Sequence, residues 1–141
     1  MGDWNAINWL AVFVCMLICV ISGSLWYNPK TFFMTWWRGI GKTAQDVPGA
    51  GSNMKVVFGL TFVSSFIQPL VMAHILPLVF PNGATAWQGM LIGFVLWLGF
   101  TAPTALVNHL FAGHRWYAWV IETSNHLLNF VLFGLILAVW R

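Results

Sequence analysis

The chain has 141 residues, of which 60% are hydrophobic and only 6% carry a full charge. A soluble domain is ordinarily about one quarter charged, and a single domain of this size cannot bury so much apolar surface in one core. The composition therefore excludes a soluble fold and predicts an integral membrane protein, because a lipid bilayer supplies the missing apolar surroundings. The formal net charge of +3 is too small for a nucleic-acid-binding surface.

The first residues carry an acid and no Lys or Arg before the first apolar run. They lack the basic segment of a signal peptide, so we expect the first helix to be retained. Cys15 and Cys19 lie one helical turn apart within that run. We interpret them as small buried hydrophobic residues rather than as a metal pair or a disulfide. Ten Trp and twelve Phe suit a protein with several aromatic belts at the membrane interfaces.

Four apolar stretches follow one another along the chain. Each is close to the roughly 20 residues that cross a bilayer as a helix, and every backbone polar group in hydrocarbon must be satisfied internally. The sequence therefore predicts an all-α fold, a polytopic four-transmembrane-helix bundle in a single domain over residues 1–141. The predicted helices span residues 7–25, 56–80, 87–111 and 119–140.

The connections between these helices differ in character. The first, residues 26–55, begins with a segment, Lys30 to Ile40, that mixes four aromatic residues with Arg38. This mixture predicts an interfacial segment that lies among the headgroups. The second connection, PNGAT, and the third, AGHRWY, are short. Short connections make the second and third helices, and the third and fourth, antiparallel neighbours.

The Lys and Arg residues predict an orientation, since cytoplasmic loops carry an excess of them. The N-terminus, the second connection and the C-terminus together hold only Arg141. We therefore expect both termini outside and the loop 26–55 in the cytoplasm. The basic residues of the first and third connections are Lys30, Arg38, Lys42, Lys55 and Arg115.

Four strings of residues resemble a known family: NWLAVFV near the start, SLWYNP at the end of the first helix, WLGFTAPTALVNHLF in the third, and GLILAVW at the end. Together they resemble DUF1761, a family of small four-helix bacterial membrane proteins of unknown function, over Asn8 to Trp140. The resemblance implies the four-helix arrangement. We expect the protein in the bacterial inner membrane, where the Lys and Arg asymmetry predicts that both termini face the periplasm. The resemblance brings no established activity and therefore no catalytic residue. Most of its weight lies on Trp26, Tyr27, Pro29, Trp97, Gly99 and Pro103.

Polar side chains within the apolar stretches are the candidate functional residues, because such groups at membrane depth are costly and usually face the bundle interior. At 3.6 residues per turn, helix four carries Glu122 and its polar neighbours on one face, and helix three carries a facing row. We expect Gln68 and His74 to lie in the opposite half of the membrane and His109 to point away. The predicted ligand- or ion-binding cluster is Glu122, His126, Asn125, Asn108, Thr104 and Tyr27.

Two interpretations of this cluster stay open. Its members can act only as hydrogen-bond contacts between helices, with Glu122 reaching the headgroups or pairing with Arg115. They can instead form a site for a ligand, an ion or a proton. Gly89 and Gly93 are predicted to line a close helix contact, and Pro103 is the best candidate for a functional break in a helix.

Three functions fit these observations. The first is a non-enzymatic ligand- or ion-binding or transport module that acts as an oligomer. The second is an accessory subunit of a larger membrane complex. The third is a haem- or chlorin-binding subunit that uses His126 or His109. We expect no enzyme and no metal site, because neither a catalytic nor a metal-ligating constellation has motif-level spacing.

Overall fold

The computed structural model describes Trp4 and residues 7–140, and these residues form helices and no strand. Four helical stretches are long and apolar enough to cross a membrane, which confirms the predicted all-helical class. The third stretch is a single continuous helix with one π-helical turn, η2, in its middle. The elements are α1 (Trp9–Trp26), α2 (Phe33–Gly39), α3 (Met54–Val79), α4 (Ala86–Leu96), η2 (Trp97–Thr101), α5 (Ala102–Phe111) and α6 (Trp116–Val139).

The long helices begin at residues whose side chains satisfy free backbone amides. The Asn8 side chain accepts a hydrogen bond from the backbone of Ala11 at the start of α1. Thr85 and Gln88 form a reciprocal capping box at the start of α4. The largest difference from the predicted boundaries is at α6, which begins at Trp116 rather than at residue 119. The turn before α6 is shorter than expected because Gly113, at a positive φ of 70°, reverses the chain directly after α5.

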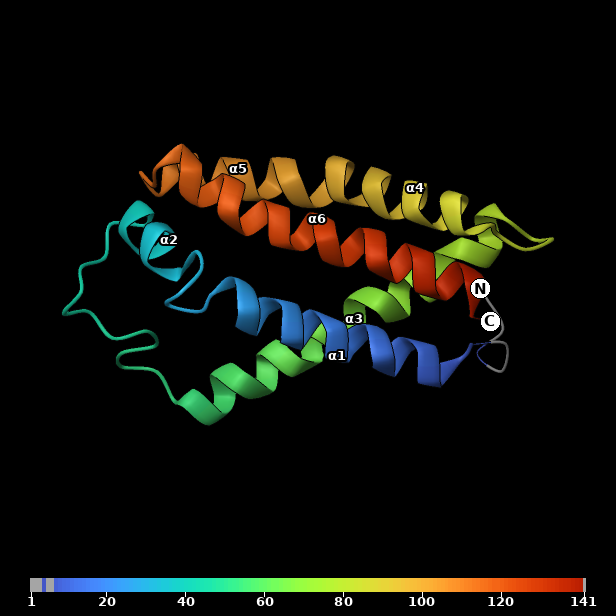
Figure 1. The fold of residues 1–141 in the computed structure, drawn as a ribbon, viewed down its shortest axis with the longest axis horizontal. Coiled ribbons are helices and arrows are strands. Elements are labelled where there is room, and N and C mark those ends of the chain that lie inside the picture. Colours follow the sequence, from blue (N-terminus) through green and yellow to red (C-terminus); the bar gives the residue numbers. More distant parts are fainter. Residues whose placement is uncertain (1–3, 5–6, 141) are drawn as a thin grey trace.

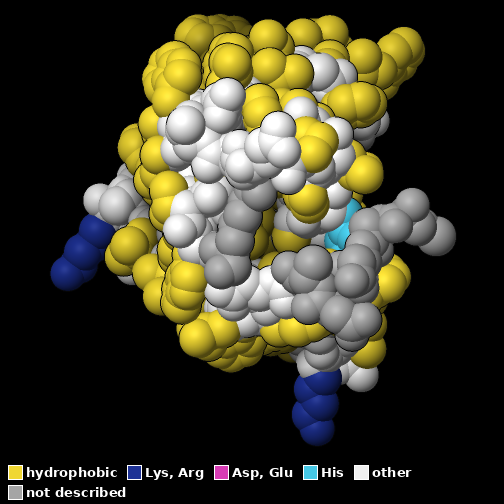
Figure 2. All heavy atoms as spheres, turned by 90° about the vertical axis from the view of Figure 1, so that its right-hand side faces the viewer, with side chains coloured by type: hydrophobic (Ala, Val, Ile, Leu, Met, Phe, Trp, Pro, Cys, Tyr) yellow, Lys and Arg dark blue, Asp and Glu magenta, His cyan; other side chains and the backbone are white. Residues whose placement is uncertain are grey.

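The helices form an elongated bundle with both ends of the chain at one end and α2 at the other (Figure 1). The continuous α4–η2–α5 helix runs antiparallel to α6 along its whole length, and α3 crosses behind α1 (Figure 1). Viewed from the end that holds the termini, hydrophobic side chains cover most of the outline (Figure 2). Such a surface suits a surrounding of lipid.

The closest contact in the bundle joins the backbones of α4 and α6. A Cβ atom added at Gly89 would collide with the carbonyl oxygen of Gly134 and lie 2.6 Å from the Cβ of Ala138. One added at Gly93 would collide with the carbonyl oxygen of Phe130. Small residues at these positions therefore let the two helices approach until their backbones touch.

The half of the bundle near the termini has a packed core. Val12 of α1, Leu76 of α3 and Phe133 of α6 are at most 1% exposed. This region is the closed half of the bundle. Its buried hydrophobic cluster consists of Ala11, Val12, Cys15, Met72, Leu76, Phe133 and Leu137.

The other half of the bundle is open, because α3 leaves its neighbours. Every residue from Met54 to Ser64 is exposed, whereas Ser65 and Pro69 are buried. Pro69 lies inside the helix and has no backbone N–H, so it interrupts the hydrogen-bond ladder where α3 diverges. The resulting open half lies beside α1, α5 and α6.

The segment predicted to be interfacial forms α2 and packs on the start of α6. The backbone N–H of Arg115 donates to the carbonyl of Gly39 at 2.8 Å, and the buried Trp37 donates its indole N–H to the carbonyl of Thr43 at 2.9 Å. The Asp46 carboxylate accepts from the backbone N–H and the hydroxyl of Thr43. These hydrogen bonds, with Lys42 nearby, hold the pKa of the Asp46 carboxyl below its usual value.

The basic residues of the first and third connections are all exposed, and both connections lie at the end of the bundle opposite the termini (Figure 1). This separation fits the charge asymmetry seen in the sequence. The remaining basic residue, Arg141, lies outside the described residues.

The α4–α6 contact predicts that Gly93→Leu destabilises the protein by about 1–3 kcal/mol or more, because a side chain there forces the two backbones apart. The midpoint of thermal unfolding in detergent should fall by roughly 5–10 °C. Gly99→Leu is the matched control, since a Cβ at Gly99 meets nothing within 4 Å, and its midpoint should stay close to wild type. Equal midpoints for the two variants would contradict the contact.

Candidate functional site

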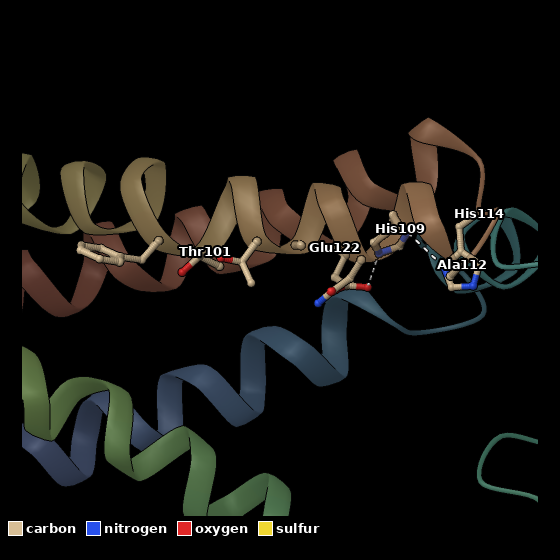
Figure 3. A pocket seen from close by; sticks show the side chains of 9 residues that line it. Thr101, His109, Ala112, His114 and Glu122 are labelled. Carbon is tan, nitrogen blue, oxygen red and sulfur yellow. Dashed lines mark hydrogen bonds and ion pairs between the residues drawn. The ribbon is translucent and has the colours of Figure 1, made fainter.

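The polar face of α6 meets a cavity in the open half of the bundle. This Glu122 cavity has a volume of about 480 Å³ and lies between α5 and the beginning of α6. Its side chains project from α5 toward the space beside α1 and α3 (Figure 3). The lining residues are Phe100, Thr101, Thr104, Ala105, Asn108, His109, Ala112, His114 and Glu122.

A chain of three ionisable side chains runs along the edge of this cavity (Figure 3). The Oε2 atom of Glu122 lies 3.1 Å from Nε2 of His109, and Nδ1 of His109 lies 3.2 Å from Nδ1 of His114. The side chain of His109 is 7% exposed and that of Glu122 is 29% exposed. The chain therefore connects the turn between α5 and α6 with a carboxylate inside the open half.

A tryptophan of α2 completes the surroundings of the carboxylate. The indole N–H of Trp36 donates to Oε2 of Glu122 at 3.4 Å, and the ring of Trp36 packs edge-on against Tyr27. Two donors from different elements thus converge on one carboxylate oxygen. The helix α2 is therefore part of the site.

A second cavity, the His126 cavity, meets α6 at Asn125 and His126, next to Glu122 on the polar face of the helix. It has a volume of about 590 Å³ and is bounded by the second half of α1, the first half of α3 and α6. Tyr27, Asn125 and His126 line it, together with Gln68 of α3. The site residues predicted from the sequence are therefore divided between two cavities, with Thr104, Asn108 and Glu122 in the first.

Three indole groups fix the helices that carry these side chains. Trp26 donates to the carbonyl of Ile121 at 2.8 Å, and Trp97 donates to the carbonyl of Thr123 at 2.8 Å. In the reverse direction, Trp119 donates to the carbonyl of Ala102 at 3.0 Å. These bonds lock α1, η2 and α5 onto the first turns of α6, next to Glu122.

Pro103 is the second residue of α5, which follows the π-helical turn, so the predicted break is a local change of helix type rather than an interruption. A proline removes one backbone donor and crowds the carbonyl four residues before it. A π turn of this kind is frequent at functional sites. Here it positions Thr101 at the inner end of the Glu122 cavity.

Asn125 takes part in a closed hydrogen-bonded ring between α1 and α6. Ser22 donates to Oδ1 of Asn129 at 2.7 Å, Asn129 donates to Asn125 at 3.3 Å, and Asn125 donates to Ser22 at 3.4 Å. The ring satisfies these buried groups and joins two helices. The interpretation as interhelical contact thus fits Asn125, whereas the interpretation as a site fits Glu122.

Two expectations from the sequence, one about His109 and one about Gln68, are wrong. His109 was expected to point away from the cluster, but α6 packs against that side of α5, so His109 is buried and binds Glu122. Gln68 was expected in the opposite half, yet it lines the same cavity as His126. The short connection before α6 was the signal for His109, because it brings the end of α5 against the start of α6.

Two other polar residues, Glu122 and His74, were given expected partners or positions from the sequence. The partners of Glu122 among the described side chains are His109 and Trp36 rather than Arg115. His74 contacts the carbonyl of Leu70 on its own helix and lies edge-on to Trp4, so it stays outside the cluster as expected.

The hydrogen bonds of His109 and the positions of possible metal ligands bear on the hypotheses of a haem site and a metal site. Both ring nitrogens of His109 are engaged by hydrogen bonds, which leaves neither free to bind iron. Within Trp4 and residues 7–140, no three His, Cys, Asp or Glu side chains form a group that could hold a metal ion.

The sequence model of a family described as protein of unknown function (DUF1761) matches residues 10–138. The chain belongs to the DUF1761 family. No curated protein and no solved structure matches it significantly. The resemblance seen in the sequence is thus confirmed, and what this DUF1761 protein does must be argued from its site.

Proposed function

We propose that this DUF1761 protein is a membrane-embedded module that binds and moves a small cation or protonatable solute. The observation that carries the proposal is the hydrogen-bonded chain from His114 through His109 to Glu122 at the edge of a cavity. An ionisable residue at membrane depth is expensive and is usually functional. Here the carboxylate has a route for protons and a space for a ligand.

With Glu122 ionised, the two hydrogen bonds fit one arrangement of protons. Neutral His109 donates from Nε2 to Glu122, so its Nδ1 is an acceptor for the Nδ1–H of His114. When His114 gains a proton at Nε2, it can pass its Nδ1 proton to His109. His109 then gives its Nε2 proton to Glu122, which becomes a neutral carboxylic acid. Histidine suits this task because its charge changes near neutral pH.

The lining of the Glu122 cavity favours a cation over an anion. Thr101, Thr104 and Asn108 offer neutral oxygen atoms beside the carboxylate, and none of the lining residues is Lys or Arg. Oxygen ligands with one negative charge suit a small hard cation or an ammonium group. Protonation of Glu122 would release such a ligand, which couples binding to the relay.

Three further features support transport by an oligomer. Four helices form a thin bundle, α3 diverges beside the polar face, and no element among Trp4 and residues 7–140 covers Met54–Ser64. A second copy against this segment would complete the wall of a pathway. We therefore propose that the working unit contains more than one copy.

A second candidate function is an accessory subunit of a larger membrane complex. The same exposed segment of α3 and the aromatic helix α2 would then contact another protein. Gentle purification in detergent distinguishes the two, because an accessory subunit copurifies with a second polypeptide, whereas a transport module yields only copies of itself.

We also propose that the protein spans the inner membrane four times with both termini in the periplasm. The support is the concentration of Lys and Arg at the end that holds the long loop. A reporter active only in the cytoplasm should give no signal when it is fused after Arg141. The same reporter inserted between residues 49 and 52 should be active. The reverse pattern would contradict the orientation.

The proposed function predicts that Glu122→Gln abolishes proton-coupled movement of the ligand while the fold stays intact. The amide keeps the size of the side chain but removes its charge and cannot take up the relayed proton. Purified protein in liposomes with an enclosed pH-sensitive dye provides the measurement, with Na⁺, K⁺ and ethylammonium offered in turn. The rate should fall at least tenfold, and His109→Gln should reduce it similarly.

Asp46→Asn is the matched control, because it makes the same chemical change on an exposed loop. Its rate should equal that of wild type. The pH dependence should include the titratable groups around Glu122. These are His109 by direct contact and His114 through His109, with Tyr27 and His126 by proximity. Unchanged, pH-dependent flux in folded Glu122→Gln would overturn the proposal.

A further inference from the structure

We infer that the His126 cavity is a separate binding site for a neutral long-chain amphiphile whose head carries a hydroxyl or carbonyl group. This inference does not depend on the proposed function, because none of His114, His109 and Glu122 lines this cavity. It assigns a ligand class to a part of the molecule that the relay does not use.

The cavity has the composition of a site for an amphiphile. Its volume of about 590 Å³ falls within the range of small-molecule pockets, roughly 300–1,000 Å³. The wall combines polar groups, such as those of Tyr27, Gln68 and His126, with apolar side chains, such as Val20 and Phe58. A ligand with one polar end and one apolar end matches this mixture.

A buried polar atom in the wall lacks a partner. Gln68 lines this cavity and a neighbouring one beside η2, and its buried Oε1 atom accepts no hydrogen bond from any described residue, so a rotation of the side chain is needed to turn this oxygen into the cavity. A buried acceptor without a donor costs about 1–3 kcal/mol, and such a group in a native structure needs an explanation. A hydroxyl head that donates to Gln68 would satisfy it.

The other polar groups of the wall complete the recognition of such a head. Tyr27 can donate from its hydroxyl, and a neutral His126 presents one donor and one acceptor. Ser65, which is buried on the α3 side, adds a hydroxyl. A head with both an O–H group and an acceptor oxygen can therefore bond to α1, α3 and α6 together.

Charge selects a neutral head. No Asp, Glu, Lys or Arg lies among the residues that line the cavity, so an anionic head would find no cation. Glu122 lies one helical turn before His126 on α6, and its carboxylate would repel a carboxylate or phosphate. An uncharged glycerol, alcohol or carbonyl head meets neither penalty.

The acyl chain has a route out of the cavity toward lipid. Phe58 is 58% exposed and Phe62 is 45% exposed, and both line the cavity from the diverging half of α3. The cavity is therefore walled by a helix whose outer surface is apolar. The ligand would enter sideways between α1 and α3, with its chain left among these aromatic side chains.

Photolabelling tests this site directly. The protein in phosphatidylcholine nanodiscs is exposed to a palmitoyl monoglyceride that carries a diazirine on its chain, and labelled peptides are identified by mass spectrometry. Labelling should concentrate on α1 residues 19–27 and α3 residues 58–68. A palmitate probe with the same diazirine, at a pH where its head is ionised, should label these peptides several-fold less.

Two variants make the test specific. Gly23 lines the cavity, and a Cβ added there meets nothing within 4 Å, so Gly23→Leu fills the cavity without a backbone collision and should abolish the labelling. Gly59→Leu is its matched control, since Gly59 is equally open but lies outside the lining, and it should label as wild type does. Gln68→Leu should weaken saturable labelling by roughly five- to tenfold.

The outcomes separate this site from the relay. Equal labelling by both probes, or equal labelling of the Gly23→Leu and Gly59→Leu variants, would show only bulk lipid around the helix and would overturn the inference. Proton flux in the liposome measurement should survive Gln68→Leu, so failure of one proposal leaves the other standing.

Discussion

The contact between the backbones of α4 and α6 is the interaction on which the rest of the structure depends. Gly89 and Gly93 on one helix and Gly134 on the other leave no room for a side chain between them. In lipid, where apolar burial drives helix association only weakly, such close packing provides much of the attraction. It fixes the long hairpin of α4–η2–α5 and α6, and that hairpin holds His109 against Glu122.

The bundle built on this hairpin is unequal along its length. Around Phe133, side chains from α1, α3 and α6 fill the interior, whereas α3 departs near Pro69 and leaves the other half open. Polar groups are concentrated in the open half, where α5 and α6 each present them to a cavity. Rigidity and openness are therefore separated within one small chain, and this separation is what the proposed binding role requires.

The sequence predicted the helices well because hydropathy and length alone determine which segments suit a bilayer. It also identified Thr104, Asn108 and Glu122, which share a cavity, from helical periodicity and depth. It missed the role of His109 and Gln68, since a helical wheel gives the direction of a side chain but not which helix lies there. The sequence could not predict that α3 leaves its neighbours, because this depends on how Pro69 is packed. Nor could it predict the hydrogen bond from Trp36 to Glu122, which depends on the tertiary docking of α2.

The central claim is that water reaches the polar face of α5 in the open half, and cysteine accessibility tests it most directly. In a Cys15→Ala, Cys19→Ala background, Thr104→Cys lines the Glu122 cavity, whereas Val107→Cys on the same helix is 51% exposed but lies outside the cavity lining. The protein is placed in vesicles that are open to reagent on both sides and treated with a charged, membrane-impermeant thiol reagent. The reagent should modify the cysteine at position 104 at least tenfold faster than the one at position 107, because a thiolate forms only where water is present. Equal, slow modification of both cysteines would show that lipid fills the open half and would contradict the account.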